Sequence, residues 1–208
     1  MPSRSNGWGL VWLERTLLVI GFVLIGYYLY VSIEAQLYQA LENRELDAIL
    51  ASAPPASPAL RRPPPAPGST LGRLEIPRLG VSAVIRAGSD ARTLSLAVGH
   101  IPGTALPGDA GNIGLAGHRD TFFRRLRDIR ADDEIRLVTA TGTFAFRVHE
   151  TSVVMPADTW VLDPTREPAL TLVTCYPFTY IGSAPKRFIV RAIGTHQSSS
   201  LREKSPVL

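Results

Sequence analysis

The feature that most constrains this chain is an uncharged apolar run near its N-terminus. Residues 16–33, TLLVIGFVLIGYYLYVSI, contain no charged side chain over 18 positions. A helix rises about 1.5 Å per residue, so this run is long enough to cross the hydrocarbon core of a bilayer. No small-x-small cleavage site follows it, and Tyr27, Tyr28 and Tyr30 lie at its far end, where interfacial aromatic residues belong. The run therefore predicts an uncleaved signal anchor, with a cleaved signal peptide as the alternative.

The charges that flank this run predict its orientation. Arg4 and Arg15 precede it, whereas the first basic residue after it is Arg44. Because lysine and arginine close to a span favour the cytoplasmic side, we expect residues 1–15 in the cytoplasm and everything after Ile33 outside it. The sequence thus predicts a single-pass protein of the cell membrane, with its main domain extracytoplasmic and the membrane as a partner.

Two segments separate the span from the rest of the chain. Residues 34–52 continue as helix-forming sequence and are expected to form a helical stalk. Residues 53–70 follow and contain seven of the 17 prolines. Proline blocks the interiors of helices and sheets, so this stretch is predicted to be an extended spacer on the order of 50 Å long. A proline-rich ligand for a recognition module is the alternative.

The sequence pattern changes at Leu71, where short apolar runs begin to alternate with turn residues. Examples are GRLEIP, GNIGLAGH, EIRLVT, ALTLVTC and RFIVRAI. Such runs predict strands, and the spacing of Phe144, Phe146 and Val148 places these three side chains on one face of a strand. We expect one short helix at residues 121–127. The segment up to Gly194 is therefore predicted to be an all-β domain that closes on itself, because closure removes exposed sheet edges.

Charge and cysteine content exclude several classes of function. The net charge is only +4, and no basic stripe with interleaved aromatic residues occurs, so nucleic acid is not expected as a partner. The chain has one cysteine, Cys175, which excludes an intrachain disulfide and a zinc site built mainly on thiolates. No cofactor and no metal site is predicted. The polar residues 195–208 are expected to be a disordered tail.

Cys175 and His118 are the first candidates for chemistry. Cys175 ends the apolar run ALTLVTC, where a side chain can point into a cleft, whereas a cysteine inside such a run would be a core residue. His118 likewise ends the run NIGLAGH. An imidazole within hydrogen-bond reach can take the proton of a thiol, or stabilise the thiolate as an imidazolium. The pair therefore indicates a cysteine nucleophile with a histidine partner, and a structural role is the alternative for each residue.

Arg187 is the third candidate, because it opens the last predicted strand, 12 positions after Cys175. Acyl transfer develops negative charge on a carbonyl oxygen, and a fixed donor at that oxygen is worth about 2.7–4 kcal/mol. Arg191 lies four residues further along and shares a strand face with Arg187 by alternation. Spacing alone therefore leaves both arginines open.

The other polar candidates are interpreted as structural. His100 lies in a predicted loop, VGHIPGT, His149 on the exposed face of a strand, and His196 in the tail. The acidic run at residues 132–134 is expected to form a solvated turn before a strand. Asp120 is expected to pair with a neighbouring arginine rather than to join a catalytic triad.

At these residues the sequence resembles the sortases, and the class D sortases in particular. The pattern T-L-x-T-C occurs at residues 171–175, an A-G-H element occurs at residues 116–118, and Arg187 opens the final strand. The runs PGTALPGDAGN before the histidine, HRDTFF after it and TCYPF around the cysteine add to the resemblance. The resemblance covers residues 71–194, and the N-terminal anchor fits it as well.

The resemblance implies a closed eight-stranded β-barrel with one or two short helices, and a cysteine transpeptidase activity. Such an enzyme cleaves a surface or pilin protein within a C-terminal sorting signal of LPXTG type and forms a thioacyl-enzyme. An amine acceptor, either a peptidoglycan precursor or a lysine of another protein, then displaces the cysteine. Carried over to this chain, Cys175 is the nucleophile, His118 the acid/base, and Arg187 the stabiliser of the oxyanion or of the bound signal.

The resemblance also bears on the loops around the site. It implies that residues 155–169 form the loop that closes over the sorting signal. Some sortases bind calcium through acidic residues before the histidine strand and in this loop. Here the stretch before His118 offers only Asp109, and Pro164 occupies the acidic position of the loop, so no calcium site is predicted.

Three other interpretations are weighed against transpeptidation. A thiol hydrolase of the same fold would release its substrate to water, and the acceptor is not encoded in the three site residues. A non-catalytic envelope protein that binds sorting signals would not need all three residues. A papain-like protease would place its cysteine before its histidine in the sequence, whereas here His118 precedes Cys175.

Overall fold

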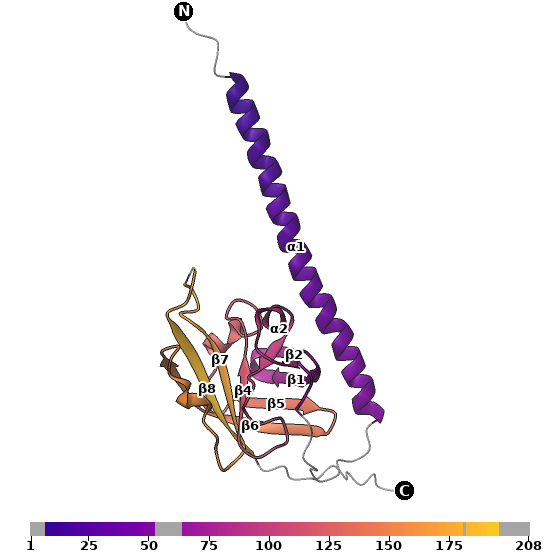
Figure 1. Cartoon of the computed structure of the whole chain (residues 1–208), viewed down its shortest axis with the longest axis vertical. Coiled ribbons are helices and arrows are strands. Elements are labelled where there is room, and N and C mark those ends of the chain that lie inside the picture. The colour runs from indigo at the N-terminus through magenta and orange to yellow at the C-terminus, as the bar shows by residue number, and fades with distance from the viewer. Residues whose placement is uncertain (1–6, 53–63, 181, 196–208) are drawn as a thin grey trace, which may run out of the picture. The chain divides into compact units, whose positions relative to one another are not determined.

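The computed structural model describes residues 7–52, 64–180 and 182–195 (Figure 1). The first six residues of the predicted cytoplasmic stretch, residues 53–63 of the predicted spacer and nearly all of the predicted tail, His196 included, lie outside the described residues. The chain divides into two units, residues 1–38 and 39–208.

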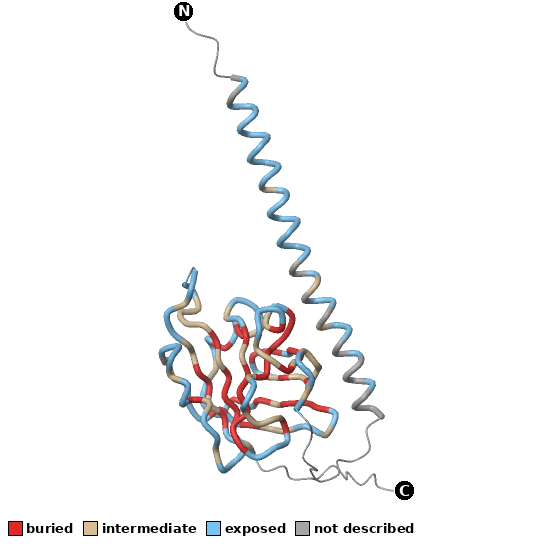
Figure 2. Tube along the Cα trace, in the orientation of Figure 1, coloured by how far each residue is buried: buried red, intermediate tan, exposed pale blue. Residues whose placement is uncertain are grey.

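A single helix, α1, spans Gly7–Ser52 and runs without interruption through the predicted stalk. Its segment Leu10–Tyr30 is long and apolar enough, by length and composition, to cross a membrane, with a mean hydropathy of 1.8. The described side chains of this segment are almost all exposed (Figure 2). An apolar helix that no protein covers needs an apolar surrounding such as lipid. The helix is therefore consistent with a membrane anchor or a signal sequence, and it overlaps the predicted span at residues 16–33.

The described part of the second unit contains eight strands that close into a barrel, as the sequence predicted. Around the barrel the strands follow the order β1-β2-β3-β4-β7-β8-β6-β5. Two neighbouring pairs, β2 with β3 and β4 with β7, are parallel, and the other pairs are antiparallel. The strands are β1 (Thr70–Ile76), β2 (Val81–Ala87), β3 (Val98–His100), β4 (Asn112–Ala116), β5 (Glu134–Thr139), β6 (Gly142–Val154), β7 (Ala169–Tyr176) and β8 (Lys186–Gly194).

Short helices occupy several of the connections between strands. They are α2 (Ala91–Leu96) and three 3-10 helices, η1 (Pro77–Leu79), η2 (Arg124–Asp128) and η3 (Thr159–Leu162). The helix predicted at residues 121–127 corresponds to η2, which begins three residues later because residues 120–123 form a turn. The sequence analysis did not predict α2, although Asp90 caps it by accepting a hydrogen bond from the Thr93 amide.

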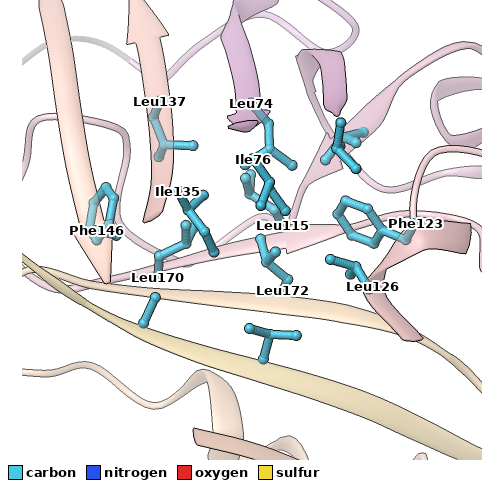
Figure 3. Close-up of a cluster of buried hydrophobic side chains, with 14 of the residues drawn as sticks. Leu74, Ile76, Leu115, Phe123, Leu126, Ile135, Leu137, Phe146, Leu170 and Leu172 are labelled. Carbon is cyan, nitrogen blue, oxygen red and sulfur yellow. The ribbon is translucent and has the colours of Figure 1, made fainter. Parts of the chain in front are cut away.

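The core lies inside the barrel and is built from the inward-facing residues of the strands (Figure 3). Leu170 and Leu172 of β7 contribute two fully buried side chains, while Phe123 and Leu126 come from the connection that follows β4. Burying a side chain of this size stabilises the fold by about 1.5–3 kcal/mol. In Figure 2 the buried segments accordingly follow the strands of the barrel.

The structure corrects two expectations for acidic residues. Asp133 is only 6% exposed, and its carboxylate accepts hydrogen bonds from Arg78 and from the Arg130 amide, so the predicted solvated turn is wrong at this position. The hydrogen bond from Arg78 lowers the pKa of Asp133 below its ordinary value. Asp120, for which a local ion pair was expected, forms none with any described residue.

His100 differs from its expectation, whereas His149 agrees with it. His100 is the last residue of β3 rather than a loop residue, and it is buried. Its Nε2 lies 2.9 Å from the carbonyl oxygen of Ala105, and burial lowers the pKa of the imidazole. His149 is exposed on β6, as predicted.

Candidate active site

Cys175 and Arg187 lie directly opposite each other on neighbouring strands. Cys175 is the penultimate residue of β7, Arg187 is the second residue of β8, and the antiparallel register pairs the two. Side chains that are paired in this way have Cβ atoms about 4.5–5.5 Å apart. Both residues are partly exposed, so the thiol and the guanidinium are neighbours that solvent can reach.

His118 approaches Cys175 from the other side of β7. The parallel register of β4 and β7 pairs Ala116 with Val173, and the Gly117 amide donates a hydrogen bond of 3.2 Å to the Val173 carbonyl oxygen. Continuing this register by two residues brings His118, which is exposed, level with Cys175. The three predicted site residues therefore lie at one edge of the barrel, where β4 and β7 end and β8 begins.

The three residues belong to the outer side of the barrel wall. Leu170 and Leu172 of β7 point into the core, so by alternation Thr171, Val173 and Cys175 point to the opposite face. The last β4 position that the register defines, Ala116, has Val173 as its partner. The site is thus a surface built on a rigid sheet, and the loops that follow the strands border it.

Two threonines of the T-L-x-T-C pattern fix this register by hydrogen bonds to the β4 side. Thr174 donates its hydroxyl to the Gly117 carbonyl oxygen at 2.7 Å, and Thr171 donates to Oδ1 of Asn112 at 2.8 Å. Thr171, Thr174 and Asn112 are all buried. A one-residue slip of β7 against β4 would break both bonds and turn Cys175 inward. From the sequence these threonines were recognised only as parts of a motif, because the partners of their side chains lie on or directly after another strand.

Phe123 supports the backbone around His118 through a hydrogen bond and a packing contact. The Phe123 amide donates to the His118 carbonyl oxygen at 3.0 Å, and the phenyl ring lies against Gly117. A Cβ on Gly117 would meet this ring at 2.8 Å, so the position has no room for a side chain. The glycine of the A-G-H element is therefore explained by packing, because it lets the chain pass over a buried aromatic ring just before the histidine.

The loop between β6 and β7 is attached to the same outer face at η3. The Val161 carbonyl oxygen accepts hydrogen bonds from Asn112 Nδ2 at 3.1 Å and from Thr171 Oγ1 at 3.3 Å. Asn112 Nδ2 also donates to the Asp163 carbonyl oxygen at 3.2 Å. One buried asparagine and one buried threonine thus attach the loop to β4 and β7.

Arg191 also contacts this loop, which separates its surroundings from those of Arg187. Its Nη1 lies 3.4 Å from the Val161 carbonyl oxygen, and its cross-strand partner is Thr171. Cys175 lies four residues further along β7 than Thr171, which corresponds to about 13 Å at 3.3 Å per residue. The spacing of the sequence left Arg187 and Arg191 open, and the register places Arg187 at the thiol and Arg191 away from it.

The guanidinium of Arg187 is oriented by the end of the β7–β8 loop. Its Nη1 donates to the carbonyl oxygens of Ala184 and Lys186 at 3.1 and 3.0 Å. Within the described residues, Nε and Nη2 of Arg187 have no hydrogen-bond partner. A guanidinium that is fixed by one nitrogen and has donors left over can bind a developing oxyanion or a peptide carbonyl.

The described residues contain no group of three or more histidine, cysteine, aspartate or glutamate side chains that could hold a metal ion. The site offers a thiol that is paired with a guanidinium and an imidazole that follows the neighbouring strand β4. These are the groups needed to activate a nucleophile, to move a proton and to stabilise negative charge on oxygen.

Comparison with known proteins is consistent with this arrangement. The model of the sortase domain matches residues 74–194, which is more than half of the chain. Sortase D of Bacillus subtilis (strain 168) is 40% identical over 127 residues, which cover 61% of this chain and 64% of that protein. The chain thus spans slightly less than two thirds of the length of this curated relative.

Solved structures show the same barrel. The sortase D5 transpeptidase of Clostridium perfringens is 33% identical, with a TM-score of 0.58 over 62% of this chain and 81% of that chain. Sortase C of Clostridium perfringens, solved with the C-terminal cell wall sorting motif, is 27% identical, with a TM-score of 0.59 over 64% of this chain and 74% of that chain.

Proposed function

This chain belongs to the sortase family, and on that premise we propose that it is a cysteine transpeptidase of the class D type. The observation that carries the proposal is the register around β7. Cys175 is paired with Arg187 on one side, and on the other side His118 continues the strand that is paired with β7. In this proposal Cys175 is the nucleophile, His118 the acid/base, and Arg187 the stabiliser of the oxyanion or of the bound peptide.

The first half of the proposed reaction forms a thioacyl-enzyme. The Cys175 thiolate attacks the carbonyl carbon of the scissile peptide bond, so that a C–S bond forms and the carbonyl oxygen becomes an oxyanion. The free donors of Arg187 stabilise this oxygen. When the oxyanion collapses, the C–N bond breaks, and the imidazolium of His118 gives its proton to the leaving amine.

The second half transfers the acyl group to a new amine. His118, now neutral, takes a proton from the incoming amine as the amine attacks the thioester carbonyl. A new C–N bond forms, the C–S bond breaks, and the Cys175 thiolate is restored. A water molecule in place of the amine would give hydrolysis, so the same residues could serve a hydrolase.

We propose surface or pilin proteins with an LPXTG-like C-terminal sorting signal as substrates, and a peptidoglycan precursor or a protein lysine as the acceptor. Support for the substrate class comes from the structural relative that was solved with the C-terminal cell wall sorting motif. The β6–β7 loop at residues 155–168, attached at η3 to the face that carries Cys175, is suited to hold such a peptide. The apolar segment of α1 would keep the enzyme at the membrane where these substrates emerge.

The proposal is tested with the full-length protein in detergent micelles and a library of quenched LPXTG-type peptides, with and without an added amine. Mass spectrometry follows the adduct on Cys175 and the products, and Cys175→Ala is the control. An adduct that becomes an amine-linked product supports the transpeptidase. An adduct that gives only hydrolysed peptide favours the thiol hydrolase, and a folded protein without any adduct favours a non-catalytic protein that binds signals.

A further inference from the structure

The residue directly after His118 holds the loop that follows Cys175. Arg119 donates from Nη1 to the Pro177 carbonyl oxygen at 3.0 Å. Its Nη2 donates to the carbonyl oxygens of Tyr180 and Gly182 at 2.6 and 3.0 Å. The guanidinium carbon also lies 5.9 Å from the centre of the Tyr180 ring. Three backbone carbonyls from one loop thus converge on a single cation.

These contacts connect two segments that both lead to the site. The β7–β8 loop, described for residues 177–180 and 182–185, begins two residues after Cys175 and ends two residues before Arg187. Arg119 holds the loop at residues 177, 180 and 182, and Arg187 contacts the Ala184 carbonyl oxygen near its end. The loop is therefore a wall of the Cys175 site, and its shape depends on an arginine that neither forms nor cleaves a bond.

An apolar contact anchors the same loop from the inside of the barrel. The Phe178 ring meets the Phe188 ring edge to face, with centroids 5.2 Å apart, and packs against the core. This contact fixes the position of the start of the loop, whereas the hydrogen bonds from Arg119 fix the orientation of its carbonyl groups. Loss of Arg119 is thus expected to loosen the wall without unfolding the barrel.

We propose that Arg119 is a positioning residue that holds the β7–β8 loop closed beside Cys175 and thereby favours an amine over water in the second half of the reaction. The inference rests on the proposed transpeptidase function. An amine acceptor must be bound and oriented before it attacks, so it needs a binding surface of fixed shape. Water reaches an open thioester from bulk solvent and needs no such site, and closure of an active site excludes it.

The test measures the ratio of aminolysis to hydrolysis for the full-length protein, together with the KM for the amine, at a fixed LPXTG-type peptide. We expect Arg119→Ala to lower the ratio by on the order of tenfold or more, because a small displacement near a reacting centre can cost up to about 100-fold. The KM for the amine should rise, whereas the rate of thioacyl formation should change less than the ratio does.

Two further variants separate positioning from simple loss of charge or stability. Arg119→Lys keeps the cation but lacks the planar fork that reaches three carbonyls, so it should lie between the wild type and Arg119→Ala. Arg124→Ala is the matched control, because this exposed arginine of η2 has no side-chain hydrogen bond within the described residues. It should leave the ratio unchanged. If Arg119→Ala does not fold, the ratio of aminolysis to hydrolysis and the KM for the amine are compared between Arg119→Lys and the wild type instead.

An unchanged ratio and an unchanged KM for the amine in a folded Arg119 variant would overturn the inference. Hydrogen exchange at the Tyr180 amide, which faces the Pro177 carbonyl oxygen, tests loop closure without turnover. Faster exchange in Arg119→Ala than in Arg124→Ala is expected, and equal exchange overturns the inference even in an inactive protein. A wild-type protein that forms no thioacyl adduct contradicts the proposed function instead.

Discussion

Two loops border the face that carries Cys175, and they are held in different ways. The β6–β7 loop is attached at η3 mainly by neutral hydrogen bonds from the buried side chains of Asn112 and Thr171, to which Arg191 adds one of 3.4 Å. The β7–β8 loop is attached by Arg119 and Arg187, whose guanidinium groups are partly exposed. A buried neutral network is costly to open, because its groups find no water when their partners leave.

Breaking the hydrogen bonds between an exposed cation and backbone carbonyls costs less free energy, because water can replace either partner. The difference teaches that the two sides of the site are suited to different tasks. The β6–β7 side is built into the sheet and keeps its shape, whereas the β7–β8 side can adjust while substrate enters and product leaves. This contrast can be tested first through the rate of catalysis and then through the free energy of unfolding.

The largest effect is expected from the two arginines of β8, each of which contacts one of the loops. Arg187→Ala should lower kcat by on the order of 100- to 1,000-fold, as the removal of an oxyanion donor does. Arg191→Ala removes the same kind of side chain from the same strand face, but beside Thr171 and η3, and should lower kcat far less. Steady-state kinetics with a quenched peptide measures both, and equal losses would contradict the assignment of Arg187.

Removal of the buried asparagine should cause the largest loss of stability. Asn112→Ala leaves Thr171 Oγ1 and the Val161 and Asp163 carbonyl oxygens with fewer partners, and each buried unsatisfied group costs about 1–3 kcal/mol. We expect the free energy of unfolding to fall by roughly 2–4 kcal/mol. Urea denaturation measures it.

Thr171 offers a matched pair of variants for the same network. Thr171→Ser keeps the hydroxyl that donates to Asn112 and should lose less stability than Thr171→Val, which leaves Asn112 Oδ1 without its donor. If the valine variant is as stable as the serine variant, the hydrogen bonds do not hold this side of the site.

The other loop should respond far less in stability. Arg119→Ala removes partly exposed hydrogen bonds, and water can satisfy the carbonyl oxygens that are left. We expect the free energy of unfolding to fall by about 0.5–1.5 kcal/mol, which is less than for Asn112→Ala. A loss as large as that of Asn112→Ala, measured in the same urea titration, would mean that both loops are structural parts of the barrel.

The smallest effect is expected from a change of pH. It should alter the free energy of unfolding through His100, whose surroundings are linked to β4. His100 is buried against the Ala105 carbonyl oxygen, and its Nε2 lies 3.2 Å from Oγ1 of Thr104, which accepts from the Gly114 amide of β4. Burial lowers the pKa of His100 in the folded state below its value of 6.5, and the hydrogen bond to Ala105 partly opposes this shift. The unfolded chain therefore binds the proton more readily than the folded one.

The consequence has a definite sign. Stability is fully present above the unfolded pKa of 6.5 and falls as the pH drops from there towards the lower folded pKa. Urea denaturation at pH 7.5 and pH 5.5 should show this loss in the wild type and a smaller loss in His100→Gln. A His100→Gln variant with the full pH dependence would assign the effect to another group.

Much of the fold and of the site could be predicted from the sequence. The apolar run at residues 16–33, the short β-branched runs after Leu71 and the alternation at Phe144, Phe146 and Val148 express propensities of neighbouring residues, and these propensities predicted the helix and the barrel. The candidates Cys175, His118 and Arg187 were found because each lies where an apolar run meets a loop, a position that sequence reveals. Their catalytic roles stay predictions.

Other features could not be predicted, because they depend on residues that are distant in the chain. Asp133 looked like a turn residue until its partner, Arg78, was found 55 positions away. Arg119 stood out in the sequence only as part of the run HRDTFF, and its three acceptors lie 58 to 63 positions further along. A side chain chooses such partners only after the barrel has closed.

By itself, then, the sequence determined which segments form the helix and the strands and which side chains are capable of the chemistry. Only the tertiary structure decided which of them meet. The register of β7 against β8 placed Arg187, and not Arg191, opposite Cys175, and the folding of two loops brought Asn112, Thr171 and Arg119 to their hydrogen-bond partners. The physical reason is that local propensity acts between neighbours along the chain, whereas register and loop packing are set by hydrogen bonds and burial between strands.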